Sequence, residues 1–125
     1  MSEQKGALKL ALTASTTSTG GDALATLNPE NADLIITKLI LVVNTPATGS
    51  ATADIGVGAT ATTSDDGLLD GVDVGTAAIL ADNVDNQGTN GKASVRWPAG
   101  EYLTVSPSAT LAGLVGNVYV QYVRV

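Results

Sequence analysis

The sequence predicts an all-β protein, a single-domain sandwich of about eight antiparallel strands with at most one short helical turn. Three observations lead to this fold class. Apolar and polar residues alternate over short runs, turn-forming residues separate the runs, and no stretch has the spacing of an amphipathic helix. The 125 residues suffice for one domain with its own core. The double Greek-key jelly roll is the natural arrangement for such a set of strands.

The first predicted strand covers residues 7–13, where leucine alternates with alanine and lysine. A period of two gives the strand one apolar face, which we expect to point toward the core. The residues on that face are Leu8, Leu10 and Leu12. Residues 1–6 are largely polar, and we expect them to form a flexible N-terminal arm. The jelly-roll domain is therefore predicted over residues 7–125.

A short strand is predicted over residues 23–27, after a Ser/Thr-rich surface loop. Residues 28–31, Asn-Pro-Glu-Asn, have the chemistry of a turn because proline restrains φ and asparagine tolerates left-handed geometry. We therefore expect the chain to reverse direction here, before the next strand.

The strongest strand signal lies at residues 33–44, which are apolar on both faces. A single core covers only one face of a strand, so the other face needs a cover. Either a loop of the same chain or a neighbouring subunit can supply it, and the sequence leaves both open. The candidate contact residues for oligomer or capsid are Leu34, Ile36, Ile40 and Val42 from this strand, with Tyr119 and Tyr122 from the last strand.

The rest of the chain divides into shorter elements. Residues 51–57 alternate again, and the connection over residues 45–50 contains Pro and Gly, which predicts an antiparallel hairpin. The Ser and Asp at the start of residues 64–71 could cap one helical turn. The remaining β-prone segments are 72–75, 76–80, 93–97, 101–106 and 116–125, and the longest loop is 81–92.

Composition excludes several function classes. The chain has no His and no Cys, which removes the usual catalytic nucleophile systems, thiolate metal sites and disulfides. A formal charge of −6 offers no basic stripe for nucleic acid or for an anionic membrane surface. No signal peptide or membrane-spanning segment is recognisable. We therefore predict a non-enzymatic protein without a cofactor, made in a reducing cytoplasm, that binds neither nucleic acid nor membrane.

Two acidic clusters are weak candidates for a cation site, because hard cations prefer several oxygen ligands. The second cluster, residues 83–88 with Asp85, matches the start of an EF-hand loop, but Ser94 stands where the bidentate Glu belongs. We interpret both clusters as solvated turns and predict no metal site. The carboxylates of the first cluster are Asp65, Asp66, Asp70 and Asp73.

Trp97 and Tyr102 are the candidate platform for stacking on carbohydrate. The competing interpretation is that Trp97, the single Trp of a chain without Phe, anchors the core or an interface. The sequence alone does not decide between these roles.

Five segments of the sequence resemble the small jelly-roll head decoration (cement) proteins of tailed bacteriophages and their uncharacterised phage-encoded relatives. The resemblance extends from Asp33 to Val125 and rests on strand and turn signatures. No catalytic residue can be carried over from it. The segments are 41–50, 53–58, 66–75, 88–91 and 112–122.

The resemblance implies a structural virion protein that decorates and stabilises a tailed-phage capsid by bridging capsomers as a homotrimer. Its partners would be copies of itself and the major capsid protein, and its location the capsid exterior after synthesis in the host cytoplasm. The alternative is a virion-displayed module that binds cell-surface carbohydrate through the loops at residues 65–73 or 83–91.

Overall fold

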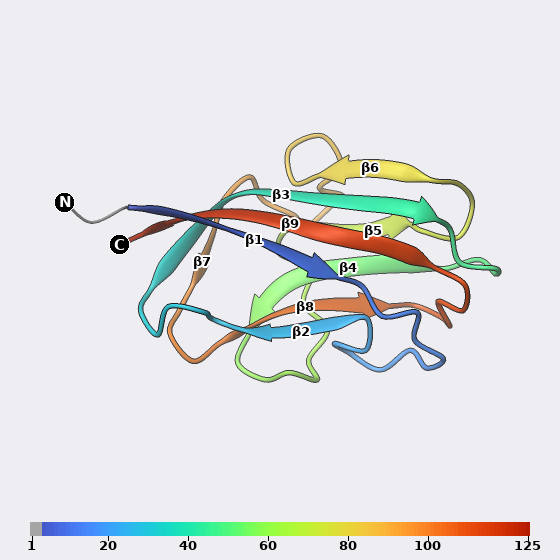
Figure 1. Cartoon of the computed structure of the whole chain (residues 1–125), viewed down its shortest axis with the longest axis horizontal. Coiled ribbons are helices and arrows are strands. Elements are labelled where there is room, and N and C mark those ends of the chain that lie inside the picture. Colours follow the sequence, from blue (N-terminus) through green and yellow to red (C-terminus); the bar gives the residue numbers. More distant parts are fainter. Residues whose placement is uncertain (1–3) are drawn as a thin grey trace.

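A computed structural model describes residues 4–125, which form two antiparallel sheets packed face to face (Figure 1). Sheet 1 has the strand order β1-β9-β3-β6, with the short β7 pairing with the other half of β3. Sheet 2 has the order β2-β8-β4-β5. The strands are β1 (Lys5–Ala11), β2 (Leu24–Leu27), β3 (Leu34–Thr45), β4 (Thr52–Gly58), β5 (Leu69–Asp73), β6 (Ile79–Asp82), β7 (Val95–Trp97), β8 (Tyr102–Pro107) and β9 (Val115–Arg124).

The strand order is that of a jelly roll. Strands pair in a nested series, β4 with β5, β3 with β6, β2 with β8 and β1 with β9, as if one long hairpin had been rolled up. Rolling then brings β3 beside β9 and β4 beside β8. The predicted all-β sandwich is confirmed, and within residues 4–125 the short β7 makes nine strands where about eight were expected.

The predicted hairpin between residues 33–44 and 51–57 is wrong. Strand β3 lies in sheet 1 and β4 in sheet 2, so the connection crosses from one sheet to the other. It is held at the crossing by backbone hydrogen bonds from Ala47 to Val74 (3.0 Å) and from Thr48 to Ala112 (2.9 Å). The Pro and Gly there serve a crossover and not a tight turn.

A β-bulge in β3 changes which side chains face the core. The register with β9 shifts between Ile36 and Lys38. Before the shift Leu34 and Ile36 are fully buried, and after it the buried positions are Leu39, Leu41 and Val43. The four predicted contact residues of this strand, Leu34, Ile36, Ile40 and Val42, therefore do not share one face, because the extra residue reverses the alternation.

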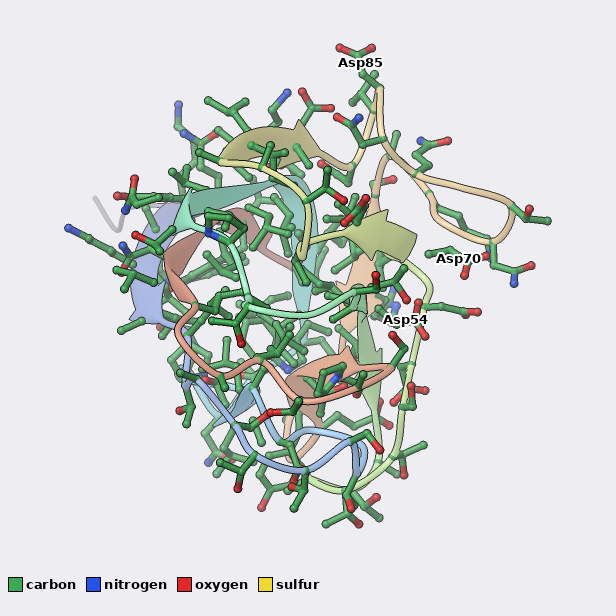
Figure 2. The ribbon with its side chains drawn as sticks, turned by 90° about the vertical axis from the view of Figure 1, so that its right-hand side faces the viewer. Asp54, Asp70 and Asp85 are labelled. Carbon is green, nitrogen blue, oxygen red and sulfur yellow. The ribbon has the colours of Figure 1, made fainter. Side chains whose placement is uncertain are left out.

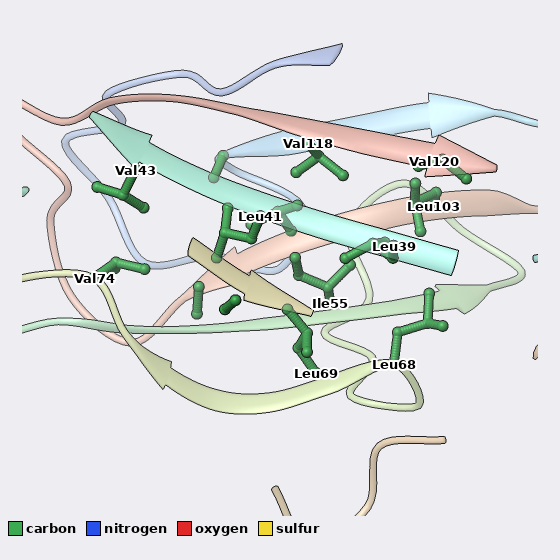
Figure 3. Packing of buried hydrophobic residues seen from close by; sticks show 14 of the residues in the cluster. Leu39, Leu41, Val43, Ile55, Leu68, Leu69, Val74, Leu103, Val118 and Val120 are labelled. Atoms are coloured by element: carbon green, nitrogen blue, oxygen red, sulfur yellow. The ribbon is translucent and has the colours of Figure 1, made fainter. Parts of the chain in front are cut away.

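The core lies between the two sheets and consists mostly of branched aliphatic side chains (Figure 3).

Residues 64–71 form no helical turn, which corrects that prediction. The Leu68 amide instead donates to the Ile55 carbonyl (2.9 Å), and both Leu68 and Leu69 are fully buried. Full burial of each such leucine stabilises the fold by about 1.5–3 kcal/mol, which is more than one solvent-exposed helical turn provides.

Strand β1 begins earlier than predicted. Lys5 and Gly6 pair with Val123 and Tyr122 of β9. The Tyr122 ring packs directly against Gly6, where a Cβ atom would come within 2.3 Å of the ring. Of the arm predicted over residues 1–6, this part belongs to the sheet, and residues 1–3 lie outside the described residues.

The turn before β3 has the predicted geometry, with Asn31 at a φ of 54°. The preceding residue of this turn, Glu30, accepts hydrogen bonds from the Tyr122 hydroxyl (2.7 Å) and from Arg124 (2.6 Å). These bonds hold the pKa of Glu30 at about 2, with the Arg124 bond as the larger cause. The turn is thereby tied to the end of β9.

Candidate contact surfaces

The outer face of sheet 2 is covered by the protein's own loops. Strand β8 points Thr104 and Ser106 away from the core, yet both are almost fully buried. The Thr104 hydroxyl donates to the Thr63 carbonyl (3.2 Å), and the Ser106 hydroxyl accepts from the Gly21 amide (2.9 Å). Loops from residues 13–22 and 59–66 therefore close this face.

The outer face of sheet 1, here called the open face, has no such cover within residues 4–125. Its side chains are exposed or half-buried and form regular rows across β1, β9, β3 and β6. One row contains Lys9, Tyr119, Ile40 and Asp82, and the next Ala11, Asn117, Val42 and Leu80. The other members of the open face are Lys5, Ala7, Ile35, Lys38, Arg96, Gln121 and Val123.

The predicted contact residues divide between the open face and the core. Ile40, Val42 and Tyr119 lie on the open face. Leu34, Ile36 and Tyr122 do not, since the first two are fully buried and Tyr122 is only 4% exposed. Those three predictions are wrong because the bulge turns the first half of β3 inward and because Tyr122 packs over Gly6.

The open face carries most of the protein's positive charge. Four of the six Lys and Arg residues lie on it. Lys38 pairs with Asp82 (3.5 Å) and Arg96 with Asp33 (2.9 Å), while the Lys9 ammonium lies 5.8 Å from the centre of the Tyr119 ring. A hollow of about 360 Å³ interrupts this face beside the bulge. It is lined by Lys5, Gly6, Ala7, Thr37, Gln121 and Tyr122.

Five carboxylates form a second surface around β4 and β5, here called the acidic edge. They are Asp54, Asp65, Asp66, Asp70 and Asp73. Asp54 accepts from the Gly71 amide (2.7 Å), and Asn90 donates to both Asp66 (3.0 Å) and Asp70 (3.1 Å). Asp54 and Asp70 lie at the right of Figure 2, on the opposite side from β1. None of the five forms an ion pair with a described residue.

The surroundings of three carboxylates at the acidic edge shift their pKa values. Burial, with smaller contributions from the charges of Asp70 and Asp66, raises the pKa of Asp54 above its usual value. Burial against β4, and then the charge of Asp66, likewise raises the pKa of Asp65, whose Oδ2 atom is buried without a hydrogen bond. Asp73 differs, because hydrogen bonds from Thr76 and Gly75 lower its pKa.

Four of the five carboxylates named as weak metal candidates, Asp65, Asp66, Asp70 and Asp73, lie on the acidic edge. Asp73 accepts hydrogen bonds within its own turn, from the Gly75 amide (2.9 Å) and the Thr76 hydroxyl (2.7 Å). Asp85 lies in a different loop, away from the acidic edge (Figure 2). Among the described residues no group of three or more acidic side chains is arranged to hold a metal ion.

Trp97 is a core residue. Its side chain is fully buried, and its indole N–H donates to the Glu101 carbonyl (2.9 Å). Tyr102 is half-buried in the other sheet, paired with Leu27 and Gly58. The predicted carbohydrate platform is therefore wrong, because Trp97 presents no ring face to solvent.

Sequence reasoning missed the structural roles of two residues, Asp54 and Asn83. Asp54 joins the acidic edge from β4, where a single Asp in an alternating strand gave no signal of a cluster. Asn83 is fully buried in the gap between β6 and β7, where its Oδ1 accepts from the Leu39 amide (2.9 Å) and its amide donates to the Ala93 carbonyl (2.8 Å). The Asn-rich composition of its loop concealed this role.

Comparison with known proteins gives a match at the level of fold. No protein-family model and no curated protein sequence matches the chain. A chain in the solved capsid of Ralstonia phage GP4 has a similar fold. The TM-score is 0.60 with 16% sequence identity, over 97% of this chain and 84% of that chain. At this identity the similarity establishes the shared fold.

The described chain also contains no helix long and apolar enough to cross a membrane.

Proposed function

We propose that this protein is a structural component of a phage virion that binds the outside of the capsid as a homotrimer, bridges neighbouring capsomers and stabilises the shell. The observation that carries the proposal is the similarity in fold, over almost the whole chain, to a chain of a phage capsid. The chemistry of the chain agrees with such a role, because it lacks His and Cys and leaves apolar side chains accessible on the open face, where Leu80 is 69% exposed.

Bridging is physically effective even when each contact is weak. A trimer that touches several capsomers has a high effective concentration at every second and third contact, so the combined attachment is far stronger than any one of them. The protein then has to supply shape and interface rather than catalysis. The open face and the acidic edge are the surfaces available for both kinds of contact.

The test uses particles that lack this protein. Adding the purified chain to them should give saturable binding and should raise the temperature at which the particles release DNA. If the chain is absent from purified wild-type particles and does not bind the deficient ones, the proposal is wrong. If the added chain changes only adsorption to host cells, it is a carbohydrate-binding module, although burial of Trp97 removes the main support for that alternative.

A further inference from the structure

Strand β1 leaves one of its edges unpaired. The order of sheet 1 ends at β1, which pairs with β9 on one side and with no described strand on the other. Just after β1 the Leu12 amide donates to the Gly116 carbonyl of β9 (3.0 Å), so the even-numbered residues of this antiparallel ladder bond to β9. The N–H and C=O groups of Ala7 and Lys9 therefore point toward the free edge.

An edge of this kind can receive a further strand. The main chain of an added segment would pair with the free N–H and C=O groups of Ala7 and Lys9. On the inner side of β1, Leu8 and Leu10 pack against the core but are only partly buried. An added strand would cover more of these two side chains, so the edge offers apolar contact as well as hydrogen bonds.

The side chains beside this edge favour an acidic partner. Lys5, Ala7 and Lys9 follow one another along the open face, and no described carboxylate forms an ion pair with either lysine. The small Ala7 side chain leaves space between the two lysines, and Lys5 and Ala7 also line the hollow of about 360 Å³. A residue opposite Ala7 on an added strand lies about 5 Å away and has both lysines as diagonal neighbours. A carboxylate at that position gains two ammonium partners.

A second copy of this chain does not suit the edge. Antiparallel pairing of two β1 strands centred on Ala7 would set each Lys5 opposite the Lys9 of the other copy, and shifting the centre by one residue leaves lysines as diagonal neighbours. Like charges opposite each other destabilise a strand pair, and lysine is a common means of preventing such self-pairing. The acidic strand β5 is not available to another copy either, because the Asp70 amide already donates to the Gln87 carbonyl (2.9 Å).

We propose that the free edge of β1 receives an extended segment of a capsid subunit as an added strand, with an acidic side chain of that segment over Ala7, between Lys5 and Lys9. This inference rests on the proposed function, because the capsid surface supplies the segment. The main-chain hydrogen bonds set the orientation of the protein on the shell, and the acidic side chain sets the register. The rest of the open face, over β9, β3 and β6, stays available for contacts between copies.

The first experiment measures backbone hydrogen exchange of the full chain, free and bound to particles that lack it. In the free chain the amides of Ala7 and Lys9 should exchange fast, whereas those of Gly6 and Leu8 are protected by β9. On the particle we expect exchange at Ala7 and Lys9 to slow by about tenfold or more. Bound chains without this protection overturn the proposal.

The second experiment compares variants for binding to the same particles. Lys9→Glu places a carboxylate beside the acidic side chain of the partner and should weaken binding by about tenfold or more. Lys92→Glu is the matched control, because it changes net charge equally at an exposed lysine between β6 and β7, and it should bind like the wild type. Equal binding by these two variants overturns the proposal.

A proline variant tests the main-chain hydrogen bonds. Ala7→Pro removes an N–H that points away from β9, so the ladder to β9 keeps its bonds while the added strand loses one. Particle binding should weaken, and an unfolding curve checks that the variant is folded. If Ala7→Pro does not fold, hydrogen exchange of the wild type and the binding of Lys9→Glu decide. Unchanged binding by folded Ala7→Pro overturns the proposal.

The outcomes separate this inference from the proposed function. A wild-type chain that binds particles without protection at Ala7 and Lys9 rejects the added strand and leaves the proposed function intact. A wild-type chain that does not bind particles rejects both. Protection of these two amides in the free chain at high concentration shows that copies pair through this edge, which also overturns the proposal.

Discussion

The outer faces of the two sheets differ in whether loops of the chain cover them. On sheet 2 the polar residues Thr104 and Ser106 are buried under loops of the same chain, whereas on sheet 1 the apolar Ile40, Val42 and Leu80 remain accessible. A polar face that is covered is unusual, and the uncovered face mixes apolar side chains with four of the six Lys and Arg residues. The chain thus covers the outer face of sheet 2 with its own loops and leaves the outer face of sheet 1 accessible, and this difference is why we propose the open face as a contact surface.

The largest expected effect is a difference in the free energy of unfolding between truncations on the inner and outer sides of β3. Leu41→Ala leaves a cavity in the core and should lower the free energy of unfolding by about 2–5 kcal/mol. Val42→Ala removes a half-buried side chain on the open face and should cost less than about 1 kcal/mol. Denaturant unfolding at a concentration low enough to keep the chain monomeric measures both. Similar losses would mean that the open face is covered after all.

The second prediction tests the cover on sheet 2. A Cβ atom at Gly56 would lie 2.7 Å from the Asp65 backbone, so Gly56→Ala forces the covering loop to move. We expect a loss of about 1–3 kcal/mol in the free energy of unfolding. Ala7→Val on the open face is the matched enlargement and should change stability by no more than about 0.5 kcal/mol. Equal tolerance at both positions would show that the loop does not pack on β4.

Alternation predicted much of this fold, and its failures have identifiable physical causes. Leu8 and Leu10 face inward as expected, and Asn31 has the predicted left-handed geometry. The β-bulge at residues 36–38 could not be predicted from the sequence. This strand is apolar on both faces, so an extra residue does not change its visible pattern of apolar residues. The wrong prediction that Leu34 and Ile36 are contact residues follows directly from this bulge.

The candidate surfaces were harder to predict than the strands. Of the predicted contact residues, Ile40 and Val42 lie on the open face because they follow the bulge in β3, and Tyr119 lies there because β9 alternates about the buried Val118 and Val120. Which face would be covered depends on long-range packing of loops such as residues 59–66, and the local pattern contains no signal for it. The acidic edge likewise depends on how Asp54 is brought to the 65–73 segment by pairing of β4 with β5.

The third prediction concerns the link between the turn before β3 and the end of β9. The pKa of Glu30 is about 2 in the folded chain and near 4.5 when unfolded, so its ionised form stabilises the fold above pH 4.5. This stability is lost as the pH falls from about 4.5 to about 2. Glu30→Gln should flatten that part of the stability profile, measured by unfolding at a series of pH values. An unchanged profile would contradict the pairing with Arg124 and Tyr122.

The smallest expected effect is at Asp65, on the covered side. Because its pKa is raised, its ionised form opposes folding, so this penalty is present above the folded pKa and disappears as the pH falls below the unfolded value. Asp65→Asn should therefore leave stability at pH 7 equal or slightly higher, with the difference vanishing in acid. Thermal unfolding at two pH values measures it. A marked loss at pH 7 would show that the carboxylate has a partner.

The most direct test of the account is the mass of the protein in solution for three chains compared side by side. Ile40→Glu places a charge in the centre of the open face, and Leu27→Glu places the same charge on β2, where Leu27 is 50% exposed. Sedimentation equilibrium should give three times the 12.5 kDa chain mass for the wild type and for Leu27→Glu, but the single-chain mass for a folded Ile40→Glu. A single-chain mass for the wild type, or a trimer of Ile40→Glu, would contradict the claim that the open face is a contact surface.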